Sequence, residues 1–322
     1  MGPELTLPPA TLHGCCITPE LRARWLEERR PRLGASEVAV AIGLPGYQSR
    51  LALFLKKTGA LPDTGDLAEA SPDTRARAEW GLRHEQAIAD KYLEQHGGHW
   101  VAEQLFVVSP EYPWLCATID RIHSSGMIVE LKTTGEERVR EWGEPESDEI
   151  PHKHLIQTLV QMHCASMRRA DVALLAGGWD YREYHTGLTG RNARTFEAVV
   201  DKAGEFIQAV HENRPPRIDP EEDAGLLAYL FDREDEAPVT FDAEQTAAWA
   251  LYEDLGRQIK DMTDRREKAK VAVAEAMGNA TRAQMTDGRA LTRKIIDVAE
   301  CCTTRKAFRY PKFSIARPRR VK

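Results

Sequence analysis

Two acidic residues and a lysine, Asp120, Glu130 and Lys132, lie within one short stretch whose pattern predicts a β-hairpin. One strand ends at Asp120, Ser124–Gly126 form the turn, and Met127–Lys132 form the return strand. Because side chains alternate along a strand, Glu130 and Lys132 project from the same face, while the apolar residues between them face a core.

Glu130 and Lys132 need partners, because burying a charge is costly unless the charge is paired or binds a metal. Asp120 on the neighbouring strand could complete a site in which two carboxylates share a hard divalent cation such as Mg²⁺. Lys132 could then polarise an attacking water or neutralise charge that develops on a phosphate. The spacing D-(x)9-E-x-K is the signature of the PD-(D/E)xK nucleases. The alternative interpretation is an edge-strand ion pair in a chain that is 29% charged.

Length and composition narrow the class of protein. The 322 residues suffice for one large domain or two small ones, and 42% hydrophobic residues can bury a sizeable core. The net charge of −6 excludes a basic nucleic-acid coat, so a polyanion site would be a local patch. The six cysteines form no C-x-x-C pair, which argues against a zinc or iron–sulfur cluster and for reduced thiols in a cytoplasm. We expect no membrane span and no secretion signal.

The order of predicted elements indicates an α/β fold. Helices alternate with strand-like segments as far as Pro216, and a second hairpin spans Ala170–Ala176 and Tyr181–Thr186. The first of these two strands is a continuous apolar run, so it should be central in its sheet. With the nuclease signature, this order predicts a restriction-endonuclease-like core over residues 1–216, in which helices flank a mixed central β-sheet.

Residues 217–322 form the predicted, mainly helical C-terminal extension, because Pro215-Pro216 is the best domain boundary in the chain. Asp242 is the expected N-cap and Gly278 the expected C-cap of a long helix. Its apolar and small residues recur about every 3.5 positions, which predicts packing against a partner helix within the chain or between subunits. A β-hairpin follows. The tail Thr303–Lys322 has eight Lys or Arg, no acidic residue and interleaved aromatics, which suits single-stranded nucleic acid, a disordered tail or a strand packed on the core.

Arginines near the N-terminus could bind an anion. Thr18 is the expected N-cap of a first helix, and Ser36 is the expected N-cap of a short second one. A helix N-terminus with a hydroxyl beside Arg29, Arg30 and Arg32 is a ready anion site. The alternative is a plain capping serine beside solvated arginines.

A long helix from about Thr74 to His96 carries Gly81 and Glu85 one turn apart. Gly81 would let another backbone approach closely, and Glu85 would point towards that backbone. Glu85 could then be a third carboxylate at the metal site. The alternative is an ordinary solvated acid on a helix.

The helix that begins at Pro151 carries two glutamines one turn apart, Gln157 and Gln161, with His154 and His163 nearby. Without a partner acid or cysteine pattern, these histidines are interpreted as core or surface residues and not as metal ligands.

Together these residues resemble the phage-type alkaline exonucleases, a family that includes the YqaJ-like viral recombinases and lambda exonuclease. The resemblance covers roughly Leu21 to Pro216 and depends on five blocks in the family's order. The blocks are Trp25-x-x-x-Arg29 leading into Gly34-Ala35-Ser36-Glu37, Gly81-x-x-x-Glu85, Ala117-Thr118-Ile119-Asp120, Glu130-Leu131-Lys132, and a helix carrying Gln157. Five ordered blocks are far more specific than the acidic residues and lysine alone.

The resemblance implies a role for each matched position. Four residues would bind the metal ions: Asp120, Glu130, Glu85 and, through its carbonyl, Leu131. Lys132 would activate water, and Gln157 would orient Lys132 or the water. Two Mg²⁺ ions would be bound, and Mn²⁺ could replace them. Two metals would neutralise charge on both the entering and the leaving oxygen of a phosphodiester.

The resemblance also implies a pocket for a 5′-phosphate, formed by Arg29, Ser36, Thr118 and Arg138. Trp25 matches an aromatic wedge near the split DNA end. A terminal phosphate carries extra charge and is well held by an arginine with a hydroxyl. Because Arg29, Arg30 and Arg32 lie close together, the arginine that would bind the phosphate stays open at this point.

The chain departs from the family pattern at three positions: Thr118 replaces a serine, Ile119 replaces a common proline, and His154 stands where a tyrosine is common. None of these changes removes a catalytic carboxylate or the lysine. Everything after Pro216 lies outside the shorter lambda enzyme, so the extension receives no residue-level role.

The implied function is an Mg²⁺-dependent exonuclease that resects the ends of linear double-stranded DNA from 5′ to 3′. It would leave a 3′ single strand for a single-strand annealing protein, in a bacterial host cytoplasm and from a phage or prophage. The family also implies a homo-oligomer, commonly a trimeric ring, whose acidic outside and basic channel would agree with the net charge. Two alternatives are an endonuclease of the same superfamily, which would nick closed circular DNA, and a DNA-end-binding module without turnover.

Overall fold

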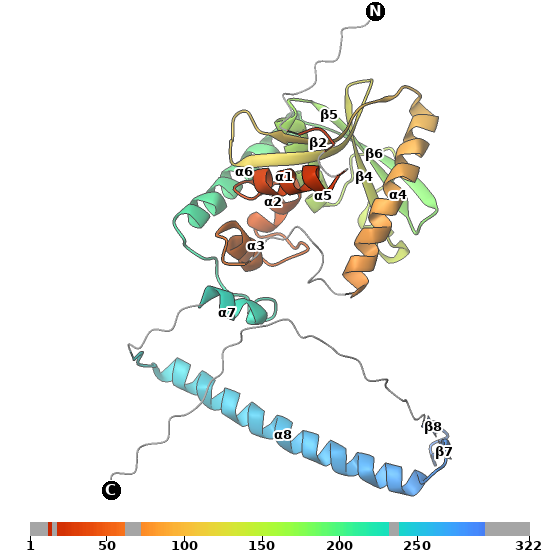
Figure 1. Cartoon of the computed structure of the whole chain (residues 1–322), viewed down its shortest axis with the longest axis vertical. Helices are drawn as coiled ribbons and strands as arrows, with labels where there is room; N and C mark the ends of the chain where they lie inside the picture. Colours follow the sequence, from red (N-terminus) through yellow and green to blue (C-terminus); the bar gives the residue numbers. More distant parts are fainter. Residues whose placement is uncertain (1–11, 15–17, 62–71, 232–237, 294–322) are drawn as a thin grey trace, which may run out of the picture. The chain divides into compact units, whose positions relative to one another are not determined.

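A mixed β-sheet forms the centre of the first part of the computed structural model, which describes residues 12–14, 18–61, 72–231 and 238–293 (Figure 1). Its strands lie in the order β1 (Leu33–Gly34), β3 (Leu115–His123), β4 (Met127–Thr134), β5 (Arg169–Ala176) and β6 (Asp180–Gly187), and β2 (Trp100–Val108) also pairs with β3. The β1–β3 and β4–β5 pairs are parallel, and the others are antiparallel. The predicted α/β class is therefore confirmed, and β5 is internal as predicted.

Strand β3 has a gap along one edge. Strand β2 pairs with the opposite edge along nearly the whole of β3. The remaining edge pairs with β1 only at Leu115 and Cys116, and with β4 only from Arg121 to His123. Among the described strands, none pairs with residues 117–120 on this edge. Asp120 thus lies beside a gap within β3, and the prediction that the strand ends at Asp120 is wrong.

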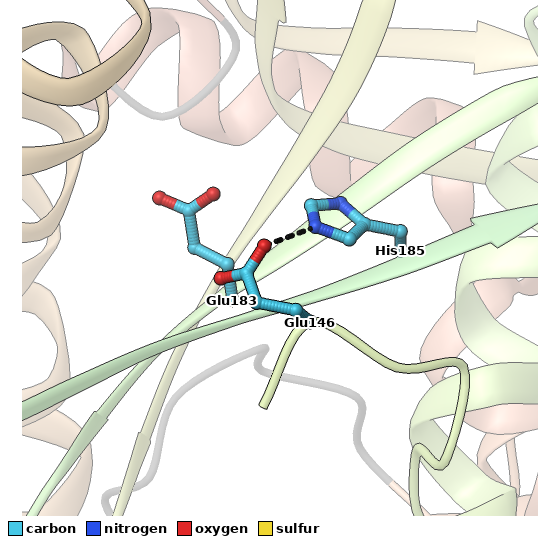
Figure 2. A group of neighbouring side chains, drawn as sticks. All are labelled: Glu146, Glu183 and His185. Atoms are coloured by element: carbon cyan, nitrogen blue, oxygen red, sulfur yellow. Dashed lines mark hydrogen bonds and ion pairs between the residues drawn. The ribbon is translucent and has the colours of Figure 1, made fainter. Parts of the chain in front are cut away.

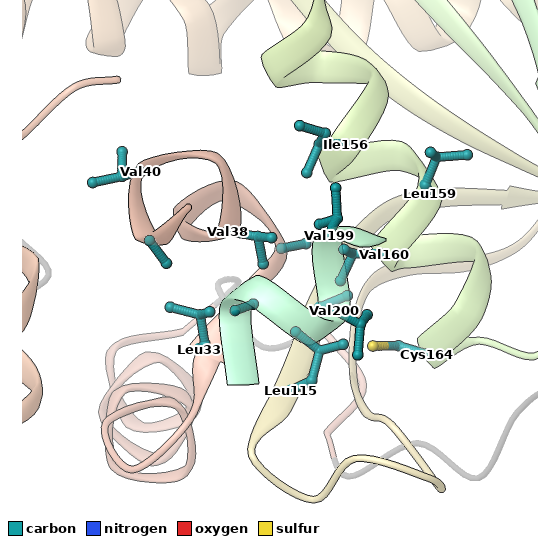
Figure 3. Packing of buried hydrophobic residues seen from close by; sticks show 14 of the residues in the cluster. Leu33, Val38, Val40, Leu115, Ile156, Leu159, Val160, Cys164, Val199 and Val200 are labelled. Carbon is teal, nitrogen blue, oxygen red and sulfur yellow. The ribbon is translucent and has the colours of Figure 1, made fainter. Parts of the chain in front are cut away.

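Four helices form the largest hydrophobic core with the sheet: α2 (Ala35–Ala41), α3 (Arg50–Lys57), α5 (His152–Cys164) and α6 (Gly190–His211). Figure 3 shows how Val38 of α2, Ile156 of α5 and Val200 of α6 meet in this core. Cys116 and Cys164, the two cysteines that the structure describes, are buried and free. Packing of α2 against α5 matters for function, because both helices carry residues of the candidate site.

Helix α4 (Pro72–His96) covers a different part of the sheet. Its buried residues Ile88 and Tyr92 pack against Val129 and Leu131 of β4, so these strand residues face a core as predicted. The expectation for Gly81 is wrong. A side chain there would lie 3.6 Å from the hydroxyl of Thr133, which is ordinary contact and not a close backbone approach.

The remaining elements of the first unit lie at its ends and in its connections. Helix α1 (Pro19–Arg29) is capped by Thr18, whose hydroxyl accepts a hydrogen bond from the Leu21 amide at 3.3 Å, as predicted. The other elements are the short helices η2 (Glu136–Glu141), η3 (Ala224–Leu226) and α7 (Leu227–Leu230). The first unit extends past the Pro215-Pro216 pair, and the domain boundary there stays a prediction.

The second unit contains helix α8 (Ala243–Met277) and the hairpin of β7 (Arg282–Gln284) and β8 (Ala290–Thr292). Asp242 caps α8 by accepting a hydrogen bond from Gln245, and Gly278 ends it with a φ of 51°, as predicted. The basic tail lies outside the described residues. Within the described ranges, no helix has the length and apolar content that crossing a bilayer requires.

Candidate active site

Glu130 is the centre of the candidate site and is only 2% exposed. Its Oε1 pairs with the Lys132 ammonium at 2.5 Å and accepts a hydrogen bond from Gln157 Nε2 at 2.5 Å. Its Oε2 accepts a hydrogen bond from Gln161 Nε2 at 2.5 Å. The two glutamines are neighbours on one face of α5, because residues four apart lie one turn apart on a helix. Both carboxylate oxygens of Glu130 are thus held by α5.

Asp120 is joined to β4 across the gap in β3. Its Oδ2 accepts a hydrogen bond from the Leu131 amide at 2.9 Å. Because the N–H and C=O of one strand residue point towards the same neighbouring strand, the Leu131 carbonyl also points towards β3. The side chain of Asp120 and the backbone carbonyl of Leu131, which the family resemblance implies as a metal ligand, therefore both lie at the gap.

The carboxylates of this site crowd one another. Burial raises the pKa of Asp120 well above its usual value, and the nearby Glu130 raises it further, against the opposing charge of Lys132. Burial likewise raises the pKa of Glu85, and Glu130 adds to this increase. Burial lowers the pKa of Lys132, but Glu130 and Asp120 outweigh it, so the pKa of Lys132 is raised and the ammonium is retained.

The donor set fits a hard divalent cation. Three mutually interacting carboxylates, those of Asp120, Glu130 and Glu85, are offset by the single ammonium of Lys132 and the nearby Arg121. Oxygen ligands of this kind are those that Mg²⁺ prefers, and added positive charge would reverse the raised carboxyl pKa values. Glu85 also accepts a hydrogen bond from Gln104 at 3.4 Å, so it is anchored to β2 and is not simply a solvated acid of α4.

Gln161 is a supporting residue that the sequence did not single out. Its Nε2 donates both to Glu130 Oε2 and, at 3.0 Å, to the carbonyl of Thr118, so it connects the two sides of the gap. The side chain is fully buried, and its Oε1 has no hydrogen-bond partner in the described structure. The signal available in the sequence was its spacing, one turn after Gln157 on the same helix face.

Replacing Gln161 with methionine should destabilise the protein and weaken metal binding. The change leaves Glu130 Oε2 and the Thr118 carbonyl without this donor, and an unsatisfied buried polar group costs about 1–3 kcal/mol. The measurement is urea unfolding and Mg²⁺ titration by calorimetry. Gln208→Met, on an exposed position of α6, is the matched control; equal effects in both variants would rule out the supporting role.

The candidate phosphate-binding residues lie next to this gap. Trp25 Nε1 donates a hydrogen bond to the Thr118 hydroxyl at 2.9 Å, although the two residues are 93 positions apart. The Arg29 guanidinium lies 5.0 Å from the centre of the Trp25 ring. Since Thr118 and Asp120 are two apart on β3, this cluster adjoins the carboxylates.

Arg29 also belongs to a buried ionic network. Glu37 pairs with Arg29 Nη2 at 2.9 Å and with Lys57 Nζ at 2.9 Å, and the Lys57 side chain is only 3% exposed. Burial raises the pKa of Glu37, but the charges of Arg29 and Lys57 outweigh it and lower that pKa. Glu37 therefore holds two cations, of which Arg29 lies beside Trp25, and the sequence did not reveal this network.

Ser36 is not the N-cap of α2. Gly34 is the N-cap residue, so no hydroxyl caps the helix, and the Gly34 amide donates to Glu37 Oε2 at 2.8 Å. Ser36 is exposed within the first turn, and Arg138 is exposed in η2. Arg32 is directed elsewhere, because its Nε donates to the carbonyl of Pro113 at 3.2 Å. Of the three arginines, Arg29 is the one in contact with Trp25.

Glu37→Gln should lower the free energy of unfolding by about 3–5 kcal/mol at pH 7, the cost of breaking a buried ion pair from one side. Because the pKa of Glu37 is lowered, its stabilisation is present above the unfolded value of about 4.3 and is lost as pH falls through the folded value. The measurement is urea unfolding between pH 3 and about 8.

The difference between wild type and Glu37→Gln should therefore shrink at acid pH. Glu28→Gln is the control, because the Glu28–Arg32 pair is partly exposed and should contribute less than about 1 kcal/mol. A cost for Glu37→Gln as small as that of the control would contradict the network.

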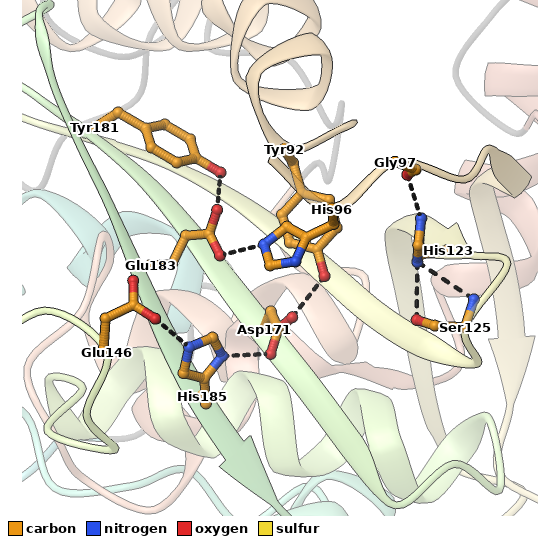
Figure 4. A network of polar contacts seen from close by, with 10 residues as sticks. All are labelled: Tyr92, His96, Gly97, His123, Ser125, Glu146, Asp171, Tyr181, Glu183 and His185. Atoms are coloured by element: carbon orange, nitrogen blue, oxygen red, sulfur yellow. Dashed lines mark hydrogen bonds and ion pairs between the residues drawn. The ribbon is translucent and has the colours of Figure 1, made fainter. Parts of the chain in front are cut away.

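A second polar cluster lies between β5, β6, α4 and the loop before α5 (Figure 4). His185 bridges Asp171 Oδ1 at 2.8 Å and Glu146 Oε2 at 2.9 Å, and Asp171 Oδ2 accepts a hydrogen bond from the Tyr92 hydroxyl at 2.6 Å. Glu183 accepts from the Tyr181 hydroxyl at 2.6 Å and pairs with His96 at 2.7 Å. The cluster joins α4 and the loop to the sheet.

Three groups of this cluster, Glu146, Glu183 and His185, have ligand atoms within 4.8 Å of one another, as a metal site would require (Figure 2). Every one of them already has a hydrogen-bond or ion-pair partner within the protein. Pairing along the strands places Asp171 and His185 level with Val129, on the face opposite Glu130. This cluster is therefore separate from the candidate active site, and its contacts describe a structural network.

Comparison with known proteins finds a family likeness in one part of the chain. Residues 24–168 match the family model of the YqaJ-like viral recombinase domain. The protein YqaJ of Bacillus subtilis (strain 168), itself described as uncharacterized, is 31% identical over 162 residues, which are 49% of this chain and 47% of that protein. The chain thus spans about half the length of this curated relative.

Solved structures with some likeness include an alkaline exonuclease from Laribacter hongkongensis and a phage-related exonuclease from Haemophilus somnus 129PT. The first is 14% identical, covers 60% of this chain and 94% of its own, and gives a TM-score of 0.46. The second is 15% identical, covers 56% and 92%, and gives a TM-score of 0.35. The likeness of this chain to the YqaJ-like viral recombinase domain thus extends over residues 24–168, and these residues contain most of the candidate site.

Proposed function

We propose that the first unit is a metal-dependent deoxyribonuclease, an exonuclease that degrades one strand of linear duplex DNA from 5′ to 3′. The observation that carries the proposal is the meeting of two groups at the gap in β3. One group is the acidic set of Asp120 and Glu130 with Lys132. The other is the Trp25–Thr118–Arg29 cluster, two residues away along the same strand.

The residues of the site divide the chemistry between them. Asp120, Glu130, Glu85 and the Leu131 carbonyl would hold Mg²⁺, or Mn²⁺ in its place. When bound, the cations would supply a water of lowered pKa and neutralise charge on the phosphodiester oxygens. Lys132 keeps its proton and donates to Glu130, so we assign it electrostatic stabilisation and orientation of the attacking water, and not proton abstraction. Gln157 holds the same carboxylate oxygen from α5.

The 5′-phosphate would bind beside Trp25. Arg29 offers its guanidinium and Thr118 its hydroxyl at this place, and the charge of Glu37 keeps Arg29 oriented. Ser36 and Arg138 remain candidates from the family pattern, and they would contact the 5′-phosphate once the DNA is bound. A pocket for a terminal phosphate next to the hydrolytic site would direct cleavage to DNA ends.

The proposal includes a partner protein, a cellular compartment and an oligomeric state. The recombinase domain of the family suits an exonuclease that leaves 3′ single strands for a single-strand annealing protein, in the cytoplasm of a bacterial host and of phage or prophage origin. A homo-oligomer, such as a trimeric ring that encloses DNA, would keep the enzyme on its substrate.

The test is digestion of a linear duplex with one 5′-phosphorylated and one 5′-hydroxyl end. Reactions contain Mg²⁺ or EDTA, and closed circular DNA runs in parallel. We expect Mg²⁺-dependent loss of the strand that carries the phosphate, with the circle untouched. Nicking of the circle would establish the endonuclease alternative. End binding without any cleavage would establish the binding module.

A further inference from the structure

The loop between α2 and α3 presents an aromatic ring at the candidate active site. Tyr47 is 82% exposed, the largest value among the large hydrophobic residues that the structure describes. The exposed ring offers a flat aromatic face on which another planar group can stack.

The loop that carries Tyr47 is held in place on both sides. A side chain on the preceding Gly46 would overlap Val40 of α2, so the loop lies directly against that helix. On the other side, Ser49 caps α3 by accepting a hydrogen bond from the Ala52 amide at 3.0 Å. The exposed ring therefore projects from a fixed support.

A cation lies over the ring. The Lys153 ammonium is 5.4 Å from the centre of the Tyr47 ring. Lys153 is at the start of α5, one turn before Gln157, so the two side chains share a helix face. Gln157 contacts Glu130. Tyr47 thus contacts Lys153, which lies one turn along α5 from the residue that contacts Glu130.

The electrostatics of neighbouring groups agree with this placement. Burial, Lys132 and Lys153 lower the pKa of His154 to about 3, so that imidazole is neutral beside them. Lys153 is therefore the cation that lies at the Tyr47 ring.

We propose that Tyr47 and Lys153 form a subsite for one unpaired nucleotide, whose base stacks on the Tyr47 ring and whose phosphate contacts Lys153. The position supports this assignment, because Lys153 is one helical turn, about 5.4 Å along α5, from Gln157, which holds Glu130. Bases of any identity stack on an aromatic face, which suits an enzyme that acts without sequence preference. The subsite deepens the proposed nuclease function and rests on it.

The experiment measures binding without cleavage. Full-length protein in EDTA is titrated into a duplex with a short frayed 5′ end that carries 2-aminopurine, and both base fluorescence and affinity are recorded. Tyr47→Ala should weaken binding about tenfold and remove the quenching, since stacking on one aromatic is worth ~1–3 kcal/mol. Tyr47→Phe should keep both. Lys153→Gln should lower the salt dependence by the contribution of about one phosphate.

Tyr252→Ala, an exposed tyrosine of α8, is the matched control and should leave both signals unchanged. Equal binding and equal quenching in Tyr47→Ala and wild type would overturn the subsite, even if the enzyme cleaves DNA. Quenching that depends on Tyr47 in a protein that never cleaves DNA would support the subsite and overturn the nuclease function. Failure of the wild type to bind the DNA at all would overturn both.

Discussion

Replacing Lys132 with alanine is expected to lower DNA cleavage by about 10²–10³-fold, the loss found when one preorganised donor is removed from a transition state. The ammonium is held 2.5 Å from Glu130 and keeps its proton, so its charge is in place before the substrate arrives. DNA affinity in EDTA should change little, because the remaining basic and aromatic groups are intact. Single-turnover digestion and a parallel binding titration separate the two effects.

Lys91→Ala is the control for this prediction. Lys91 lies on α4 in an exposed pair with Glu94, so its removal deletes a similar charge away from the site. Thermal unfolding of both variants checks that the fold survives. Full cleavage by Lys132→Ala would remove the catalytic assignment, whereas equal losses of cleavage and binding would reduce Lys132 to a DNA contact.

Replacing Asp120 with asparagine should abolish the response to Mg²⁺ and stabilise the metal-free protein. The pKa of Asp120 is raised, mainly by burial and then by Glu130, so the folded state binds its proton more tightly than the unfolded state does. The ionised carboxylate therefore costs stability, and this cost grows as pH rises through the range between the two pKa values. Asparagine removes the charge and still offers an oxygen to the Leu131 amide.

Differential scanning calorimetry at pH 8 is the measurement. Wild type should gain about 2.7 kcal/mol when Mg²⁺ is 100-fold above its dissociation constant, and the variant should gain nothing. Asp90→Asn is the control, because Asp90 lies exposed on α4, where it accepts a hydrogen bond from Gln86. A variant that is less stable than wild type without metal, or that keeps its Mg²⁺ response, would contradict the assignment of Asp120.

Much of the fold could be predicted because it depends on local rules. The alternation around Glu130 and Lys132 placed both on one face of β4, and the capping residues Thr18 and Asp242 begin their helices as expected. A continuous apolar run in the sequence predicted the buried strand β5. These features are determined by residues that are close to one another in the sequence.

The remaining features depend on contacts between distant segments. Glu37 accepts a hydrogen bond from the backbone amide at the start of α2 and pairs with two cations, Arg29 and Lys57. No spacing in the sequence joins these residues. The sequence alone does not mark Gln161 as special among helical glutamines, because its role depends on a hydrogen bond to the carbonyl of Thr118, 43 residues away.

The residues of the candidate site come from separate segments of the chain, and this determines the order in which the site forms. Asp120 and Lys132 come from one local hairpin, but the amides that hold Glu130 lie 27 and 31 residues further along the chain. Local contacts form sooner than distant ones. During synthesis the charged residues therefore emerge as an unsupported hairpin, and the site is assembled only after α5 has been made. The candidate site is therefore complete only when residues as far as Gln161 have been made and folded.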